Sequence, residues 1–290
     1  MSSIWIVMPI LALLMFLVGT ELSKTSFKTI IKHPIPILIG LIGQLIFLPL
    51  IAILIGLIMD LNPIYFAGLM LIALSPGGSS SNAFTLLVRG NLELSVLLTL
   101  LSSIITIITL PFAMNLVSFY LLRGTTFAVD MIAGKIIFQN ILLTIVPILF
   151  GIVLKKMYPK KIFFLSKLLH RILLPSLLIL VFIFILQHTN EICDNLIELG
   201  GAVTILIVVA ILCSSLLSRI SNLSLPIRRT IIIEVGMQNA AQAIAIATSP
   251  FIFGNESLAL PGIIYTLLMN IILLLYVFVT TNNLMKYKAQ

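Results

Sequence analysis

The stretch that decides the fold is residues 64–90, which read IYFAGLMLIALSPGGSSSNAFTLLVRG. It is long enough to cross a bilayer as a helix, which takes about 20 predominantly apolar residues. Pro76, Gly77 and Gly78 lie near its centre, and such a sequence interrupts a helix. Backbone groups freed at that depth are tolerated only where protein buries them or where they line a water-filled cavity. The sequence therefore predicts a broken membrane helix.

Residues 227–250 form a second interrupted span, which reads IRRTIIIEVGMQNAAQAIAIATSP. Paired interrupted spans in the two halves of a chain are typical of transporters built from inverted repeats. In such transporters half-helix N-terminal ends face an anion, while unwound carbonyls hold cations. Gly and Pro also occur in membrane helices that are merely kinked. Two interruptions, each followed by a polar cluster, favour the transporter.

The composition makes the bilayer the solvent of this chain. Of 290 residues, 60% are hydrophobic and 9% are charged, whereas about a quarter of a soluble domain is charged. The apolar runs are about 20 residues long and uniformly apolar, which predicts helices and not the alternating strands of a barrel. We expect an all-α polytopic membrane protein with nine spans, at residues 4–22, 35–59, 64–88, 93–121, 133–154, 168–187, 198–218, 227–250 and 259–281.

Basic residues gather in every second loop, and this positive-inside pattern sets the orientation. It predicts an N-terminus outside and a C-terminus in the cytoplasm, in a bacterial inner membrane. The net charge of +8 then reflects topology and does not indicate a nucleic-acid partner. The N-terminal run lacks a basic region and a cleavage site, so we expect a retained span and no signal peptide. The basic loop residues include Lys24, Lys28, Lys32, Arg89, Lys155, Lys156, Arg219, Arg228, Arg229, Lys286 and Lys288.

Glu234 is the one carboxylate deep inside a predicted span. A charge at that depth is costly unless it is paired or solvated, and Lys135 is the single basic residue near a matching depth. The expected counter-charge is therefore a bound cation, although a protonated or helix-paired acid is the alternative. Hydroxyl and amide oxygens with one carboxylate form a hard site suited to a small cation. Those side chains belong to Gln44, Ser81, Asn82, Ser95 and Thr99.

The sequence contains no nucleophile motif, P-loop or H-E-x-x-H motif, so we expect neither an enzyme nor a cofactor. Cys193 and His188 fall in a predicted external loop, and Cys213 falls inside a span, which argues against a disulfide and a zinc site. The basic segment at residues 163–174 is predicted to lie at the cytoplasmic interface or in a short loop.

Three motifs resemble the bile acid:sodium symporter family: SPGGSSSN at residues 75–82, GNLELSVLLT at residues 90–99 and EVGMQNAAQAIAIA at residues 234–247. The resemblance covers nearly the whole chain, which looks like a bacterial-type member without the first of the usual ten spans. It implies a panel domain (residues 1–34 and 125–195) and a core domain (residues 35–124 and 196–290). Two discontinuous core helices would cross near mid-membrane, with two sodium ions behind the crossing.

Carried over by motif, the resemblance also implies the site residues. The first sodium site would be Ser81, Asn82, Ser95, Thr99 and Glu234. The second would be the side chains of Gln44, Glu234 and Gln238 with the backbone carbonyls of Val235 and Met237. The anion would sit at the crossing, near Ser79 and Asn239. Ser79 stands where the family frequently has Thr.

The predicted function is sodium-coupled import of a small organic anion by alternating access. A pantoate-like, 2-oxo or hydroxy carboxylate is the expected substrate, and a bile-acid-like anion is a further candidate. The expected partners are this anion, sodium ions and the lipid bilayer. Two alternatives stay open: a passive organic-anion channel or facilitator, and a sodium/proton antiporter. The antiporter usually needs more than one buried titratable group.

Overall fold

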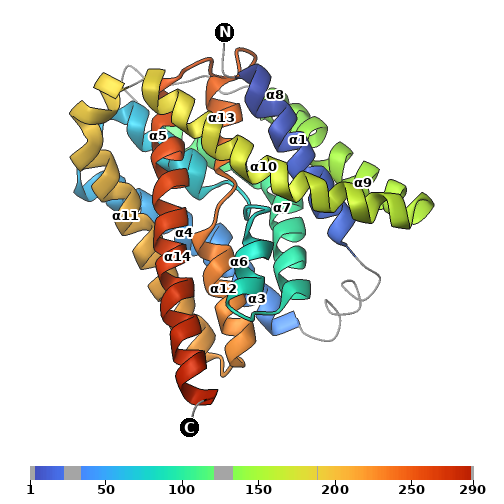
Figure 1. The fold of residues 1–290 in the computed structure, drawn as a ribbon. Coiled ribbons are helices and arrows are strands. Elements are labelled where there is room, and N and C mark those ends of the chain that lie inside the picture. The colour runs from blue at the N-terminus through green and yellow to red at the C-terminus, as the bar shows by residue number, and fades with distance from the viewer. Residues whose placement is uncertain (1–3, 23–33, 121–132, 188, 289–290) are drawn as a thin grey trace.

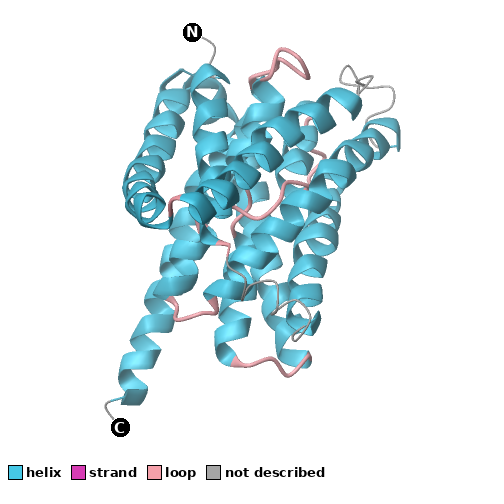
Figure 2. Cartoon of the chain, turned by 90° about the vertical axis from the view of Figure 1, so that its right-hand side faces the viewer, coloured by secondary structure: helices cyan, strands magenta, loops and turns pink. Residues whose placement is uncertain are grey.

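The structure, a computed structural model, describes residues 4–22, 34–120, 133–187 and 189–288, and these residues are helical apart from short loops and one isolated bridge (Figure 2). The predicted all-α class is therefore confirmed. The predicted loop residues Lys24, Lys28 and Lys32 lie outside the described residues, as does His188.

The helices are labelled in Figure 1. In chain order they are α1 (Ile4–Glu21), α3 (Pro34–Ile42), the π-helical turn η1 (Gly43–Phe47), α4 (Leu48–Ile58), α5 (Pro63–Ala73), α6 (Ser81–Leu87), α7 (Leu92–Tyr120), α8 (Ala133–Asn140), the π-helical turn η2 (Ile141–Ile145), α9 (Val146–Met157), α10 (Pro159–Gln187), α11 (Thr189–Ile220), α12 (Leu225–Gly236), α13 (Ala240–Thr248), the 3₁₀ turn η3 (Ser257–Ala259) and α14 (Leu260–Lys288).

Several of these helices have the length and apolar composition of membrane spans. In the described residues five continuous stretches qualify: Pro34–Ile58, Leu92–Tyr120, Ala133–Met157, Ile192–Ile220 and Ser257–Asn282. Val7–Glu21 and Pro63–Ala73 are shorter apolar helices. The third predicted span is divided into α5 and α6, and the eighth into α12 and α13, which confirms both interruptions. The chain is thus a multi-pass membrane protein.

Two local predictions were wrong. The segment 163–174 lies inside the continuous helix α10 and does not form the short loop that was one alternative for it. Residues 189–197, expected in an external loop, form the first turns of α11, a helix of 32 residues. A helix of that length measures about 48 Å, whereas the hydrocarbon core is about 30 Å thick. A helix can extend beyond the membrane into water, where charged residues are tolerated. The charged residues at 189–197 therefore did not mark the start of α11 correctly.

Two prolines explain the two π-helical turns. Pro49 and Pro147 each lie two residues beyond such a turn. Proline lacks an N–H group and its ring clashes with the preceding helical turn, and a wider π turn relieves that clash. Leu48 accordingly donates to Gly43 O, and Val146 donates to Ile141 O. The wider turns contain Gln44 and Thr144 respectively.

The helices pack in two groups. The small layer consists of α1, α8, η2, α9 and α10, and α1 packs most closely against α9 and α10 (Figure 1). The large layer contains the remaining helices, with α11 against α12 and α14, and α7 against α3, α6 and α12. Contacts of α1 with α13 and of α7 with α8 join the two layers.

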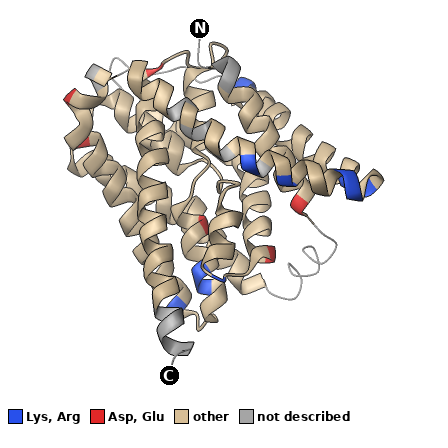
Figure 3. Ribbon diagram, in the orientation of Figure 1, with Lys and Arg blue, Asp and Glu red and all other residues tan. Residues whose placement is uncertain are grey.

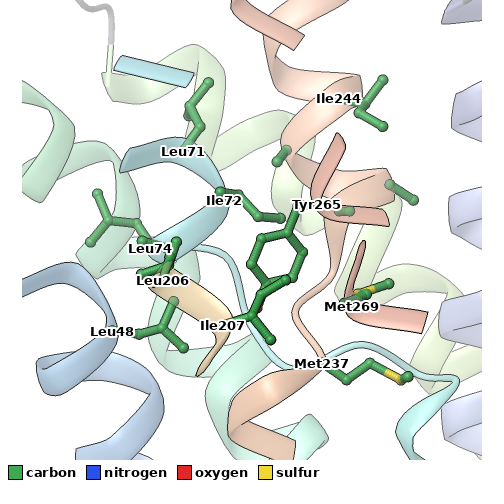
Figure 4. Packing of buried hydrophobic residues seen from close by; sticks show 14 of the residues in the cluster. Leu48, Leu71, Ile72, Leu74, Leu206, Ile207, Met237, Ile244, Tyr265 and Met269 are labelled. Atoms are coloured by element: carbon green, nitrogen blue, oxygen red, sulfur yellow. The ribbon is translucent and has the colours of Figure 1, made fainter. Parts of the chain in front are cut away.

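Buried apolar residues hold the centre of the large layer. Figure 4 shows Tyr265 of α14 among Ile72, Ile207 and Met269. The Tyr265 hydroxyl donates to the carbonyl oxygen of Gly236 at 3.1 Å, which is where α12 ends. The core therefore fixes the end of one broken helix.

Candidate functional site

The two breaks meet and pair through their backbones. Gly78 N–H donates to Met237 O, and Asn239 N–H donates to Pro76 O, each at 2.8 Å. Gly77 and Gln238 form an antiparallel bridge between these bonds. The predicted crossing of two discontinuous helices is therefore confirmed. The pairing satisfies polar groups that would otherwise be costly to bury in a membrane.

Glu234 lies beside this crossing, in the last turn of α12, and is fully buried. Its Oε1 accepts hydrogen bonds from Ser81 Oγ at 2.5 Å and from Ser95 Oγ. Its Oε2 accepts from Thr99 Oγ1 at 3.1 Å. Three hydroxyls from α6 and α7 thus converge on one carboxylate of α12. Among the described residues, no Lys or Arg donates a hydrogen bond to this carboxylate.

Asn82 joins the same cluster. Its Oδ1 accepts from Ser95 Oγ at 2.7 Å, and its Nδ2 donates to the carboxylate of Glu21 on α1. The structure therefore brings together all five side chains predicted for the first sodium site. It also adds Glu21 of the small layer, which the sequence analysis did not select.

Gln44 and Gln238 bond to backbone carbonyls at the end of α12, where Glu234 lies. Gln44 Nε2 donates to the Glu234 carbonyl oxygen at 2.8 Å, and Gln238 Nε2 donates to the Val235 carbonyl oxygen at 2.9 Å. Both amide oxygens, Gln44 Oε1 and Gln238 Oε1, are buried without a hydrogen-bond partner. A buried polar atom left unsatisfied costs about 1–3 kcal/mol. Two orphaned acceptors beside a carboxylate fit a bound cation.

The two backbone carbonyls predicted for the second site each accept one bond already. Val235 O accepts from Gln238 Nε2, and Met237 O accepts from Gly78 N–H. A carbonyl oxygen has two lone pairs, so each retains one. No cluster of three or more His, Cys, Asp or Glu residues occurs in the described residues, and the donors here are hard oxygens.

A cavity of about 260 Å³ opens between the layers. Ser79, Ser80 and Asn82 line it from the large layer, and Leu17 and Glu21 line it from α1. Asn239, predicted to share the anion site with Ser79, is not among the residues lining this cavity. Its side chain instead caps α13, accepting from Gln242 N–H at 3.1 Å.

A second set of polar contacts joins the layers where α8 meets α13. Ser249 Oγ donates to Gln139 Oε1 at 2.8 Å, and Gln242 Nε2 donates to Asn140 Oδ1 at 3.3 Å. The sequence analysis missed these residues as well. Two adjacent amides inside an otherwise apolar span were the available signal.

The close approach at Gly77 gives a prediction. A Cβ atom there would lie 2.8 Å from Gln44 Nε2 and 2.9 Å from Glu234 Oε2. Gly77→Ala is expected to destabilise the protein by about 1–3 kcal/mol, because overpacking a filled site forces its neighbours to move. Gly134→Ala is the matched control, since a Cβ there meets nothing within 4 Å. Thermal unfolding in detergent measures both, and equal losses would contradict the packing argument.

A broken-helix crossing beside a buried, oxygen-lined carboxylate is the architecture of a secondary transporter. The chain belongs to the Sodium Bile acid symporter family, which matches residues 8–198. It is therefore a transport protein and not an enzyme.

Three relatives show the range of the family. The chain is 30% identical over 252 residues to "Probable sodium/metabolite cotransporter BASS1, chloroplastic" of Arabidopsis thaliana, covering 87% of this chain and 60% of that protein. It is 26% identical over 266 residues to "Uncharacterized sodium-dependent transporter YocS" of Bacillus subtilis (strain 168), covering 90% and 78%. It is 26% identical over 241 residues to "Hepatic sodium/bile acid cotransporter" of Rattus norvegicus, covering 79% and 63%. The chain thus spans about three fifths of the plant relative's length.

Proposed function

We propose that this chain is a sodium-coupled symporter that imports a small organic carboxylate by alternating access. The observation that carries the proposal is Glu234, which is fully buried and receives hydrogen bonds from three hydroxyls. A buried carboxylate without a cationic partner is costly, and a sodium ion supplies the missing charge. The relatives named as sodium-dependent transporters support this reading.

Two sodium ions fit the arrangement better than one. The hydroxyl side of Glu234 offers Ser81, Ser95, Thr99 and the Asn82 oxygen. The amide side offers the unpartnered oxygens of Gln44 and Gln238. These sets approach the carboxylate from different helices, and each supplies the oxygen ligands that a hard cation prefers.

Alternating access would move the small layer against the large layer, as panel against core. The panel would then comprise residues 1–34 and 125–195, and the core residues 35–124 and 196–290. The layers touch through Glu21 and Asn82 near one end and through Asn140 and Gln242 near the other. Contacts at two ends can be made and broken in turn, while the backbone-paired crossing stays intact.

The cavity beside Ser79 supports a short substrate. Its volume of about 260 Å³ is below the about 300–1,000 Å³ typical of drug-sized ligand pockets. A pantoate-like, 2-oxo or hydroxy carboxylate is therefore favoured over a steroid. The anion would bind at the crossing, between Ser79 and the Asn239-capped start of α13.

Uptake into proteoliposomes tests the proposal. A labelled short carboxylate should accumulate above its external concentration only with an inward sodium gradient. Equilibration without accumulation, whatever the sodium gradient, would indicate a passive facilitator. Sodium efflux driven by a proton gradient in the absence of any carboxylate would indicate an antiporter.

The orientation proposed for this membrane protein is N-terminus outside and C-terminus in the cytoplasm of a bacterial inner membrane. Arg219, Arg228 and Arg229 line one cavity with Tyr276 and Thr280 of α14, so these basic residues lie beside the C-terminal helix. Figure 3 shows basic residues at the lower end of α12, beside α14. A C-terminal alkaline phosphatase fusion should be inactive and a green fluorescent protein fusion bright. The reverse pair of results would show that the orientation is inverted.

A further inference from the structure

Asn140 and Thr144 present polar atoms that the proposed sodium sites do not use. Asn140 ends α8, and Thr144 lies four residues later in η2. Their side chains are 2% and 1% exposed, yet Asn140 Nδ2 and Thr144 Oγ1 have no hydrogen-bond partner. Buried polar atoms in native proteins are nearly always partnered. A helical Thr commonly donates to the carbonyl one turn earlier, and the π turn at this position accompanies the loss of that bond.

The hydrogen-bond network fixes which atom of Asn140 is free. Gln242 N–H donates to Asn239 Oδ1, so Asn239 Nδ2 faces Gln242 Oε1, at 3.4 Å. Gln242 must then present Nε2 to Asn140, whose Oδ1 accepts it at 3.3 Å. The unpartnered atom of Asn140 is therefore the amide nitrogen, a donor. The unpartnered atoms near Glu234 are the acceptors Gln44 Oε1 and Gln238 Oε1, which suit a cation. Asn140 Nδ2 is instead a donor, which requires an accepting oxygen.

The geometry points to a substrate subsite formed by Asn140 Nδ2 and Thr144 Oγ1 that takes a neutral carbonyl or hydroxyl oxygen of the transported carboxylate. This inference rests on the proposed function, since it adds a second contact to the same substrate. The bonds between Asn239, Gln242 and Asn140, at 3.3–3.4 Å, are longer than the usual 2.7–3.2 Å for N–H donors. Such long bonds are easily opened when the layers part at α8 and α13, and a substrate oxygen can then accept from Asn140 Nδ2.

Matched acids test the subsite. Purified protein in saturating sodium is titrated with 2-oxobutanoate, 2-hydroxybutanoate and butanoate, and with equivalent series of other chain lengths, while thermal stabilisation is measured. The unchanged protein should bind the oxo or hydroxy acid of at least one series more tightly than the plain acid. Asn140→Ala and Thr144→Val should each lower that affinity about threefold to tenfold, which is the loss of one hydrogen bond. The affinity for the plain acid should change less than about twofold.

Two further variants separate the subsite from general damage. Thr144→Ser keeps the hydroxyl and should retain the preference, whereas Thr109→Val removes an exposed hydroxyl that bonds within α7 and should change nothing. Stabilisation by sodium alone should survive in every variant. Equal weakening of all acids, or no change in Asn140→Ala and Thr144→Val, overturns the subsite. If sodium stabilises the unchanged protein but no carboxylate does, the proposed function is wrong. That result comes from the unchanged protein alone and is therefore distinct from a failure of the subsite.

Discussion

Replacing Glu234 by Gln is expected to abolish stabilisation by sodium and to reduce sodium-driven uptake by about two decades or more. Gln preserves the volume and one oxygen but removes the charge to which the hydroxyls of Ser81, Ser95 and Thr99 converge. Removing one partner of a buried charged pair costs about 2–5 kcal/mol, and each 1.4 kcal/mol is tenfold in affinity. A ligand at a hundredfold excess over its Kd stabilises a fold by about 2.7 kcal/mol, and this increment should vanish.

Glu93→Gln is the control for this experiment, because Glu93 is exposed in the first turn of α7. Thermal unfolding is recorded with sodium and with an impermeant organic cation at equal ionic strength. Both proteins should insert and purify alike, and only the Glu234 variant should lose the difference between the two salts. An undiminished response to sodium in Glu234→Gln would remove this carboxylate from the ion site.

An inside-negative membrane potential is expected to raise substrate accumulation by between one and two decades per 100 mV. Two sodium ions entering with one monovalent carboxylate carry one net positive charge inward in each cycle. Glu234 does not alter this count, because it stays in the protein in every state. One charge moved through 100 mV is worth about 2.3 kcal/mol, and 1.4 kcal/mol is tenfold. The unpartnered oxygens of Gln44 and Gln238 are the structural reason for expecting the second ion.

A potassium diffusion potential across proteoliposomes measures this effect at a fixed sodium gradient. Uptake and accumulation should increase when valinomycin makes the interior negative, and they should fall when the gradient is reversed. Liposomes without protein and liposomes without sodium are the controls. Uptake that depends on sodium but is indifferent to potential would mean one sodium ion per anion, with the second oxygen set unused.

The polar cluster around Glu234 was predictable because polar residues are rare in these spans. The otherwise apolar helices contain a few polar residues, among them Ser81, Ser95, Thr99 and Glu234. Polar groups buried in a membrane must find polar partners, so these side chains are expected to contact one another. The first break was predictable from Pro76, Gly77 and Gly78, which interrupt a helix. The second was predictable from Gly236 and the polar residues that follow it in an otherwise apolar span. Both features follow from local chemistry and need no knowledge of distant contacts.

The contacts between the layers could not be predicted in this way. Glu21 looked like the end of a span, and its contact with Asn82 joins residues 61 positions apart. Asn140 and Gln242 are 102 positions apart, and nothing in either segment indicates its partner. The length of α10 was also missed, because basic residues are compatible with a helix as well as with an interfacial loop. Tertiary packing decided each of these cases.

The pairing at the crossing has a consequence for how the family diverges. Gly78 N–H to Met237 O and Asn239 N–H to Pro76 O are bonds between main-chain atoms, which any sequence supplies. Selection can therefore exchange the side chains around the crossing, and with them the preferred cargo, while the architecture is inherited unchanged. Gly77 cannot be exchanged freely, because there is no room for a Cβ atom. The residues proposed to bind the ions would be conserved for their oxygen ligands. Two relatives of this chain, 26% and 30% identical to it, are named for bile acid and for metabolites respectively. Such names are expected if the backbone arrangement is kept while the side chains around it vary.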